Sequence, residues 1–495
     1  MDGRTILYRG TLKSCNYHCS YCPFSRHPVS ERELAKDREQ WFSFIRFVDR
    51  HVAGWGIRAL MVVPYGEALI HPWYWQGLAQ LSALPQIRAV GAQTNLSFPL
   101  RLFTDCFAGV GGQKEKLRLW ATFHPEMTEV SVFAERCREL HDQGVQICAG
   151  AVGVPQNLPV LESLRRALPE EIYLWINKMD GLKRPYTDQE RAAFTALDPY
   201  FIRELLPVPA DTDRCRERLF AEGDGRLHTC NISPPLGLRW AETNPDLPAA
   251  GFPAPVCRRK ICSCYLAYGG RNDPVSRMLF GPYPLFRIPR RSRAVFLDIA
   301  DILLPNGECM EEFSVVLPLL AQEGTVLFLT ARLPYREAME RCQSIRHLFH
   351  GGIFAGGAYL VLQSEGECGE GREQFFDLDE FWNSAEPFLQ KMARCNAFRI
   401  LCYKHKGRCY KITLLRPRHR PWEEAEAHRL YESLPGKHSV RAIRQGSCLQ
   451  FVDRRADQAG GVRLLCRWMG ISRTEVFLDS AAGEEETDKR KGVKE

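Results

Sequence analysis

Short apolar runs alternate with longer amphipathic stretches along the first two hundred residues. The apolar runs predict strands at 5–9, 59–64, 89–94, 117–123, 145–152 and 172–176. Between them, apolar positions recur at helical spacing over 39–51, 73–84 and 130–143. Strands separated by helices imply a parallel sheet with crossover connections. We therefore expect an α/β fold here, as a barrel or as part of one.

The pattern changes after this region. Residues 206–287 contain Gly, Pro and clustered Cys with few periodic runs, which predicts a small cysteine-rich extension. The basic, proline-bearing segment 288–293 reads as a linker. Strand and helix patterns resume over 294–482, which predicts a second α/β unit. The last residues, 483–495, have almost no apolar positions, and we expect them to form a disordered tail.

Composition narrows the class of protein. The chain has 495 residues, 45% of them apolar and 25% charged, with a formal net charge of +7, as is usual for a globular protein. No block concentrates the positive charge, so we expect no nucleic-acid partner. The N-terminus lacks the apolar core of a signal peptide, and no apolar run approaches the ~20 residues that span a bilayer. These features predict a cytoplasmic protein with no membrane partner.

Cysteine is unusually frequent, with nineteen in the chain, and its first cluster is tightly spaced. Cys15, Cys19 and Cys22 form a C-x3-C-x2-C pattern within one eight-residue loop. Three thiolates this close can hold three corners of a cubic iron–sulfur cluster and leave the fourth iron open. A zinc site completed by His18 or His27 is the alternative that the residues leave open.

The cysteine loop resembles the signature of the radical S-adenosylmethionine (SAM) superfamily. In that family a [4Fe–4S] cluster binds SAM through its open iron, and the resemblance places Tyr21 against the adenine. The stretch 61–67 (MVVPYGE) resembles the family's glycine-rich strand end, with Gly66 and Glu67 at its Gly-Glu pair. Asn95 and Gly150 stand at positions that contact SAM in the family.

This resemblance implies a fold and a chemistry for residues 1–205. The expected fold is a partial (β/α)6 radical SAM barrel. The expected reaction is reductive cleavage of SAM to a 5′-deoxyadenosyl radical, which abstracts hydrogen from an unknown substrate, for which a peptide is one candidate. An electron donor such as flavodoxin or ferredoxin is the expected partner. No residue of this chain is assigned a catalytic role by the resemblance.

A second group of cysteines lies in the predicted extension. It resembles the shortened (twitch or SPASM-like) extensions that carry an auxiliary cluster after a radical SAM barrel, and residues 1–290 as a whole resemble an uncharacterised bacterial radical SAM subgroup. The resemblance implies a second [4Fe–4S] cluster, for which we expect the ligands Cys215, Cys230, Cys262 and Cys264, with Cys257 as the substitute. A zinc site and unligated cysteines are the two alternatives.

The C-terminal unit opens with a run, 294–304, that resembles the first strand of haloacid dehalogenase (HAD)-like phosphatases. In that family an Asp nucleophile is followed two residues later by an Asp that acts as general acid and base. Asp298 fits the nucleophile, but Ala300 stands at the second position and Asp301 is displaced by one. Thr330 matches the next family element. The resemblance implies a HAD-like Rossmannoid domain with a cap inserted at about 370–445.

Later HAD elements are altered. Gln458 stands where the family places a lysine against the phosphate. Asp479 is kept in the final acidic motif, but Gly483 stands where a second acid is expected, with Glu484 beside it. We therefore expect weak or absent phosphatase activity and doubtful Mg²⁺ binding. The alternative function is a HAD-type phosphatase with a regulatory, metal-binding N-terminal region; a third is a zinc-stabilised binding protein.

Overall fold

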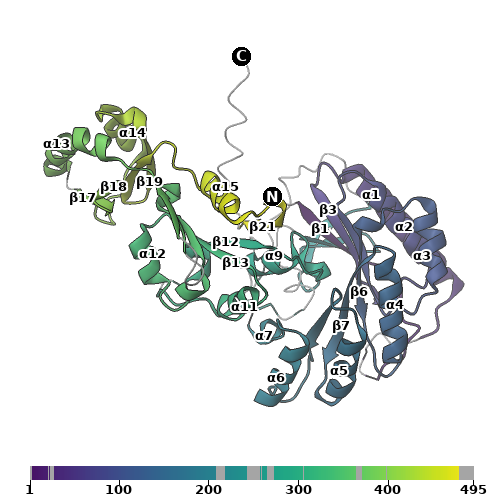
Figure 1. Ribbon diagram of the computed structural model, residues 1–495. Helices are drawn as coiled ribbons and strands as arrows, with labels where there is room; N and C mark the ends of the chain where they lie inside the picture. The colour runs from purple at the N-terminus through teal and green to yellow at the C-terminus, as the bar shows by residue number, and fades with distance from the viewer. Residues whose placement is uncertain are drawn as a thin grey trace. The chain divides into compact units, whose positions relative to one another are not determined.

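The chain forms two compact units, Met1–Arg290 and Arg291–Glu495, each described here by itself (Figure 1). The computed structural model describes residues 3–20, 22, 27–207, 218–241, 257, 259–262, 264, 273–304, 306–363, 371–396 and 398–478. The predicted tail and five predicted or discussed site residues lie outside this set: Tyr21, Cys215, Asp479, Gly483 and Glu484. Within the described part, no helix has both the length and the apolar character needed to cross a membrane.

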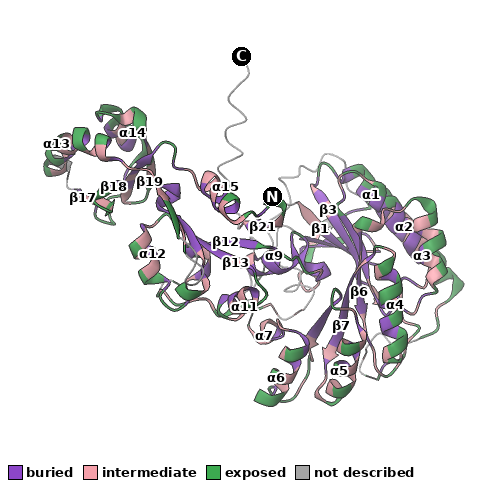
Figure 2. Ribbon diagram, viewed as in Figure 1, coloured by how far each residue is buried: buried purple, intermediate pink, exposed green. Residues whose placement is uncertain are grey.

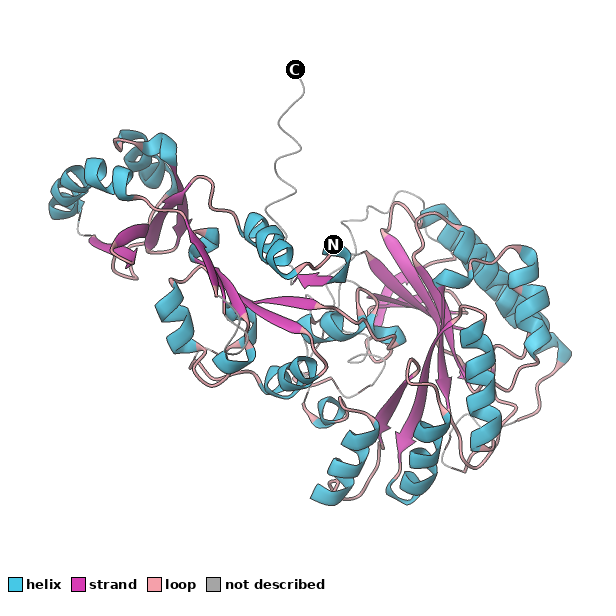
Figure 3. Cartoon of the chain, viewed as in Figure 1, coloured by secondary structure: helices cyan, strands magenta, loops and turns pink. Residues whose placement is uncertain are grey.

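The first unit is built on a mostly parallel sheet (Figure 3). Six of its parallel strands are, in spatial order, β1 (Arg4–Arg9), β3 (Ile57–Val62), β5 (Ala89–Thr94), β6 (Leu117–Thr122), β7 (Gln146–Gly153) and β8 (Tyr173–Lys178). The helices that connect them are α1 (Glu31–His51), α2 (Pro72–Ala83), α3 (Leu100–Cys106), α4 (Val130–Asp142) and α5 (Leu158–Ala167). Because each crossover returns to the next parallel strand, α1 to α4 lie along one face of the sheet (Figure 1).

Local sequence explains why α1 forms. Ser30 caps the helix by accepting from the Glu33 amide, and the Glu33 carboxylate binds back to the Ser30 N–H. Trp41, Phe44 and Val48 then recur at helical spacing and are fully buried. This apolar stripe packs against the sheet and joins the main core of the unit (Figure 2).

The two faces of the sheet are covered differently. On β8, Leu174 and Ile176 belong to the core beneath the helices. The alternate residues point the other way: Tyr173 packs against Phe280 of α9 (Pro274–Phe280), with the ring centroids 5.6 Å apart and the planes tilted by 45°. Both faces are therefore apolar, as is usual for a parallel sheet.

Three further strands extend the sheet beyond β1. β9 (Arg218–Glu222) pairs parallel to β1, and β10 (Arg226–His228) and β11 (Pro235–Arg239) continue antiparallel. Three strands of the predicted cysteine-rich extension thus belong to the same nine-stranded sheet, whose outermost described strands are β11 and β8. The observed class is mixed α/β with parallel strands, as predicted.

The second unit contains a six-stranded sheet and an inserted subdomain. The sheet order is β16 (Arg372–Phe375), β15 (Tyr359–Leu362), β14 (Gly351–Phe354), β13 (Val326–Thr330), β12 (Ala294–Asp298) and β21 (Val476–Leu478). Strands β14, β13, β12 and β21 are parallel. Its helices are α10 (Ile299–Ile302), α11 (Glu311–Gln322), α12 (Tyr335–Arg341) and α15 (Gln458–Met469).

The inserted subdomain, here called the cap, lies between β16 and α15 in the chain. Its antiparallel sheet has the order β17 (Arg399–His405), β18 (Arg408–Leu415), β20 (Cys448–Asp453) and β19 (Val440–Gln445). Helices α13 (Asp379–Asn396) and α14 (Glu424–Ser433) pack on one face and enclose a separate apolar core. The cap therefore has its own core, distinct from the core of the six-stranded sheet.

A buried carboxyl group in the first unit makes its stability depend on pH. Asp198 is fully buried, and burial raises its pKa from 3.8 to about 6, against hydrogen bonds from the Tyr173 hydroxyl and the Ile176 amide. Between about pH 4 and 6 the folded state keeps a proton that the unfolded chain has lost, so stability is greatest below this window and falls as pH rises through it. The loss is on the order of 3 kcal/mol.

Replacing this group should remove that dependence. We expect the difference in unfolding free energy between wild type and Asp198→Asn to change across pH 4–6.5 in urea titrations. The exposed Asp188→Asn variant is the control and should track wild type. Parallel curves for wild type and Asp198→Asn would contradict the assignment.

Candidate functional site

The clearest chemical arrangement lies at the carboxyl edge of the six-stranded sheet. Asp298 is the last residue of β12, and Thr330, the last residue of β13, is its direct partner across the parallel ladder. The strands before both residues are buried, so the chain leaves the core at this edge. Carboxyl ends of parallel strands are where open α/β sheets bind their ligands.

The Asp298 carboxylate is held at both oxygens. Its Oδ1 accepts from the Ala300 amide at 2.9 Å and caps α10, while its Oδ2 accepts from the Thr330 hydroxyl at 3.4 Å. Thr330 is fully buried, whereas Asp298 is half-buried. The carboxylate is thus fixed in direction and still reachable from solvent, as a nucleophile requires.

The residue two positions further on cannot transfer a proton. Ala300 presents an exposed methyl group, and its contribution to Asp298 is made through its backbone amide. Asp301 follows on α10 with a half-buried side chain. The described arrangement therefore provides a fixed carboxylate but no carboxyl group at the position where the HAD resemblance expects the general acid.

Hydrogen bonds join the loops that follow β13 and β14 at this edge. The Gly356 amide donates to the Ala331 carbonyl, and the Ala355 amide donates to the Leu333 carbonyl. Gly357 has a φ of +97°, and a Cβ there would lie 2.6 Å from the Asp457 backbone, so glycine is required. Asp457 caps α15, whose first residue is Gln458. The start of α15 therefore lies against the loop that follows β14.

Two basic residues of the cap contact the same loops. Lys411 of β18 donates through Nζ to the Arg332 carbonyl at 2.5 Å, and Arg441 of β19 donates through Nη2 to the Gly356 carbonyl at 2.9 Å. Lys411 is only 2% exposed, and burial lowers its pKa to about 8. Sequence reasoning missed both residues. A lysine inside the otherwise apolar run 409–415 was the available signal for Lys411.

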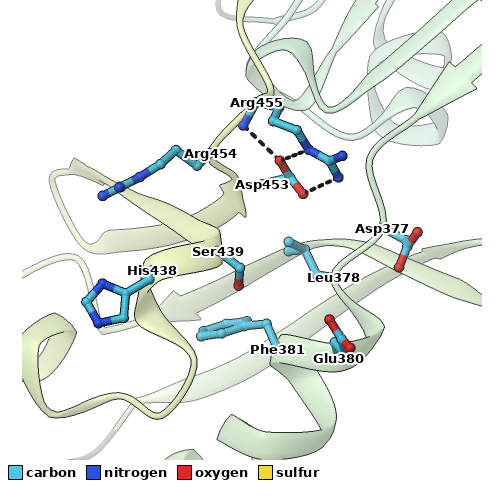
Figure 4. A pocket seen from close by; sticks show the side chains of 9 residues that line it. All are labelled: Asp377, Leu378, Glu380, Phe381, His438, Ser439, Asp453, Arg454 and Arg455. Atoms are coloured by element: carbon cyan, nitrogen blue, oxygen red, sulfur yellow. Dashed lines mark hydrogen bonds and ion pairs between the residues drawn. The ribbon is translucent and has the colours of Figure 1, made fainter.

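A separate pocket of about 470 Å³ lies where the cap joins the sheet (Figure 4). Asp453, at its upper wall in this view, forms a two-point ion pair with Arg455. Glu380 and Arg454 lie on exposed parts of the lining. Because its charged lining is exposed or already paired, this pocket lacks the fixed, half-buried carboxylate found beside Thr330.

In the first unit, the structure brings together three of the predicted cofactor-site residues. The Asn95 amide nitrogen Nδ2 lies 3.6 Å from the Cys15 Sγ, and the Asn95 backbone N–H donates to the Glu67 carboxylate at 2.5 Å. Glu67 is fully buried, and burial raises its pKa to about 7. Burial raises the pKa of the Cys15 thiol to about 11, with Cys19 and Cys22 close enough to contribute.

The predicted glycines have packing reasons for their identity. A Cβ on Gly66, whose φ is +112°, would lie 2.0 Å from the Ser14 carbonyl, where β4 (Tyr65–Gly66) pairs with β2 (Lys13–Ser14). A Cβ on Gly150 would lie 2.7 Å from the indole nitrogen of Trp120. Close packing therefore explains both residues without a bound cofactor.

The second cysteine group is placed only in part. Cys264 receives a hydrogen bond from Asn231 Nδ2 at 3.1 Å, and the Asn231 oxygen accepts from Arg9 at 2.6 Å. Cys257 is exposed, while Cys230 and Cys262 are half-buried. Cys215 lies outside the described residues, and the ligand roles of all five cysteines stay predictions.

Comparisons with known proteins match only part of the chain. No protein-family model and no curated protein matches the chain. Among solved structures, it is similar to a HAD-superfamily phosphatase from Bacteroides thetaiotaomicron at 11% identity and a TM-score of 0.30, covering 38% of this chain and 76% of that one. A haloacid dehalogenase-like hydrolase from the same organism has 14% identity, a TM-score of 0.30, and coverages of 38% and 80%. A HAD subclass IIB sugar phosphatase has 13% identity, a TM-score of 0.29, and coverages of 38% and 80%.

These findings correct the predicted function. The prediction of a radical SAM enzyme is contradicted: the solved structures named above are HAD-superfamily proteins, and none of them is a radical SAM enzyme. Among the described residues, moreover, no group of three or more His, Cys, Asp or Glu is placed to hold a metal ion. The expectation that phosphatase activity is weak or absent is contradicted on the same grounds. The individual ligand assignments, the cofactors and the electron donor stay predictions.

Magnesium is the ion that the HAD resemblance implies for this edge. Mg²⁺ takes one or two carboxylates and keeps several waters. Asp298 offers one carboxylate of the right chemistry, and Asp479, which would follow β21, lies outside the described residues. The donor chemistry therefore fits in part, and the steps below use only the side chains of this chain.

Proposed function

We propose that the second unit is a phosphatase that uses Asp298 as its nucleophile. The observation that carries this proposal is the half-buried Asp298 carboxylate, held between the Ala300 amide and the Thr330 hydroxyl at neighbouring strand ends. A carboxylate fixed in this way can attack phosphorus without first losing conformational freedom. The buried cation Lys411, which contacts the next loop, adds positive charge that favours an anionic substrate.

The reaction follows from these groups in two steps. A carboxylate oxygen of Asp298 forms a bond to phosphorus while the ester P–O bond breaks, and the leaving oxygen keeps the electron pair. Water then attacks the phosphorus of the aspartyl phosphate, which releases orthophosphate and restores the Asp298 carboxylate. Thr330 keeps the carboxylate oriented in both steps, because its hydroxyl can donate to Asp298 throughout. A Mg²⁺ ion, when bound, would neutralise charge on the phosphoryl oxygens.

The proposal is tested by following the phosphate. The full chain is incubated with Mg²⁺ and p-nitrophenyl phosphate, and orthophosphate release is measured. A second sample given ³²P-labelled acetyl phosphate is quenched in acid. We expect release of orthophosphate and a protein-bound label that hydroxylamine removes, as an acyl phosphate should. No release and no label would overturn the proposal.

A further inference from the structure

The cap carries a cation, Lys411, whereas the core helix α15 begins with the neutral residue Gln458. The HAD resemblance expects a lysine at 458 against the phosphate, but the chain has Gln458 at the start of α15. Its amide Nε2 is buried and has no hydrogen-bond acceptor among the described residues. A buried donor without an acceptor is costly, and it marks a place where an acceptor from a ligand would be stabilised.

Lys411, on cap strand β18, contacts the loop that follows β13 at the carboxyl edge of the six-stranded sheet. Its Nζ contacts the Arg332 carbonyl, two residues after Thr330, which donates to Asp298. A lysine at 2% exposure is rarely kept without a charged partner, because desolvating an ammonium group is expensive. The contacts of Lys411 are the neutral Arg332 carbonyl and the Tyr403 ring, whose centroid lies 5.8 Å from Nζ, while the Glu337 carboxylate acts at longer range. An anion bound at this edge would supply an opposite charge closer to Lys411 than Glu337 does.

The packing shows that these groups share one edge. The Ala331 and Leu333 carbonyls are bonded to the loop after β14, and Gly357 of that loop lies against Asp457 at the start of α15. Arg441 fixes the cap strand β19 on the same loop. The segment that Lys411 contacts is therefore continuous, through hydrogen bonds and close packing, with the turn that carries Gln458.

We propose that Lys411 binds the phosphate group of the substrate from the cap side and replaces the cation that Gln458 cannot provide. This inference rests on the proposed phosphatase function. It assigns substrate binding jointly to the cap and the core, so that a phosphate ester is held between Asp298 and a cap strand.

Two variants separate a phosphate-binding role from a purely structural one. Lys411→Gln keeps an amide that can donate toward the Arg332 carbonyl but loses the charge. Lys411→Arg keeps the charge. We expect Lys411→Gln to weaken orthophosphate binding, measured by calorimetry on the full chain, about 30-fold, and Lys411→Arg to weaken it no more than about 5-fold. In steady-state assays the Gln variant should raise KM by a similar factor and change kcat less.

The control is Lys404→Gln on the neighbouring strand β17, an exposed lysine that should bind orthophosphate as wild type does. Thermal unfolding of each variant is measured in parallel. Unchanged phosphate binding in Lys411→Gln, or the opposite ranking with Arg weaker than Gln, would overturn the inference. If Lys411→Gln does not fold, Lys411→Arg decides: a folded Arg variant that has lost phosphate binding overturns the inference. Phosphate binding that follows Lys411 while no ester is hydrolysed would overturn the phosphatase proposal and leave the binding site standing.

Discussion

The Asp298→Asn variant is expected to lose phosphatase activity by roughly 10³-fold or more in kcat/KM, because an amide is a far weaker nucleophile than a carboxylate. The fold should be unaffected. The oxygen of the introduced amide can still accept from the Ala300 amide, and the Thr330 hydroxyl can turn to accept from the new NH₂ group. The measurement is the steady-state rate with an aryl phosphate, together with acid-quench labelling, which should be absent in the variant.

Asp301→Asn is the matched control for this prediction. Asp301 lies three residues along the chain on α10, and a one-residue shift of the motif would make it the functional acid. We expect less than about a tenfold loss for this variant, since Asp301 lies on α10 and not at the strand end beside Thr330. An inactive Asp301→Asn protein beside an active Asp298→Asn protein would show that the nucleophile was assigned to the wrong residue.

Ala300→Asp is expected to raise the rate with alkyl phosphates by about 10²-fold, since general acid catalysis is worth about that much. An alkoxide is a poor leaving group and needs a proton, whereas a nitrophenolate leaves without one. The wild-type chain, with a methyl group at 300, should therefore strongly prefer aryl or acyl phosphates. Ala300 is exposed, so a carboxyl group fits there without displacing the core.

The control for this gain is Ala300→Asn, which adds similar volume but no acidic proton. The rates of both variants are compared over alkyl and aryl phosphates of graded leaving-group acidity. We expect the Asp variant to flatten the dependence on leaving group and the Asn variant to keep the wild-type dependence. Equal rates for the two variants with an alkyl phosphate would show that the proton comes from elsewhere.

Hydrophobic periodicity was enough to predict much of the secondary structure. The predicted strand 89–94 is β5 (Ala89–Thr94), and the predicted helix 130–143 is α4 (Val130–Asp142). These elements are long and strongly patterned, and their buried positions repeat with a clear period. Part of the predicted extension instead joins the first sheet through β9. Pairing between β9 and β1 is a long-range contact, and a sequence pattern of five residues does not specify it.

Only part of the candidate functional site could be predicted from the sequence. Asp298 and Thr330 end two apolar strands, so their shared edge could be inferred. Lys411 could not, because its role depends on how a cap strand faces a loop 79 residues earlier in the chain. The cysteines led instead to a wrong prediction. Their close spacing suggested a function that the comparisons contradict, because spacing alone does not determine the chemistry of a site.

The position of the cap in the chain has a consequence for biosynthesis. The core strand β12 pairs with β21, so the core sheet cannot be completed until Val476 of β21 has been translated. The cap is made in between, and its separate core allows it to fold while the nascent core sheet still lacks a strand. Arg455 lies over the Phe376 ring at 5.2 Å, so the two segments that enter and leave the cap run close together. A folded cap would bring the segment that leads to β21 close to the core sheet that contains β12, and would shorten the loop that remains to be closed.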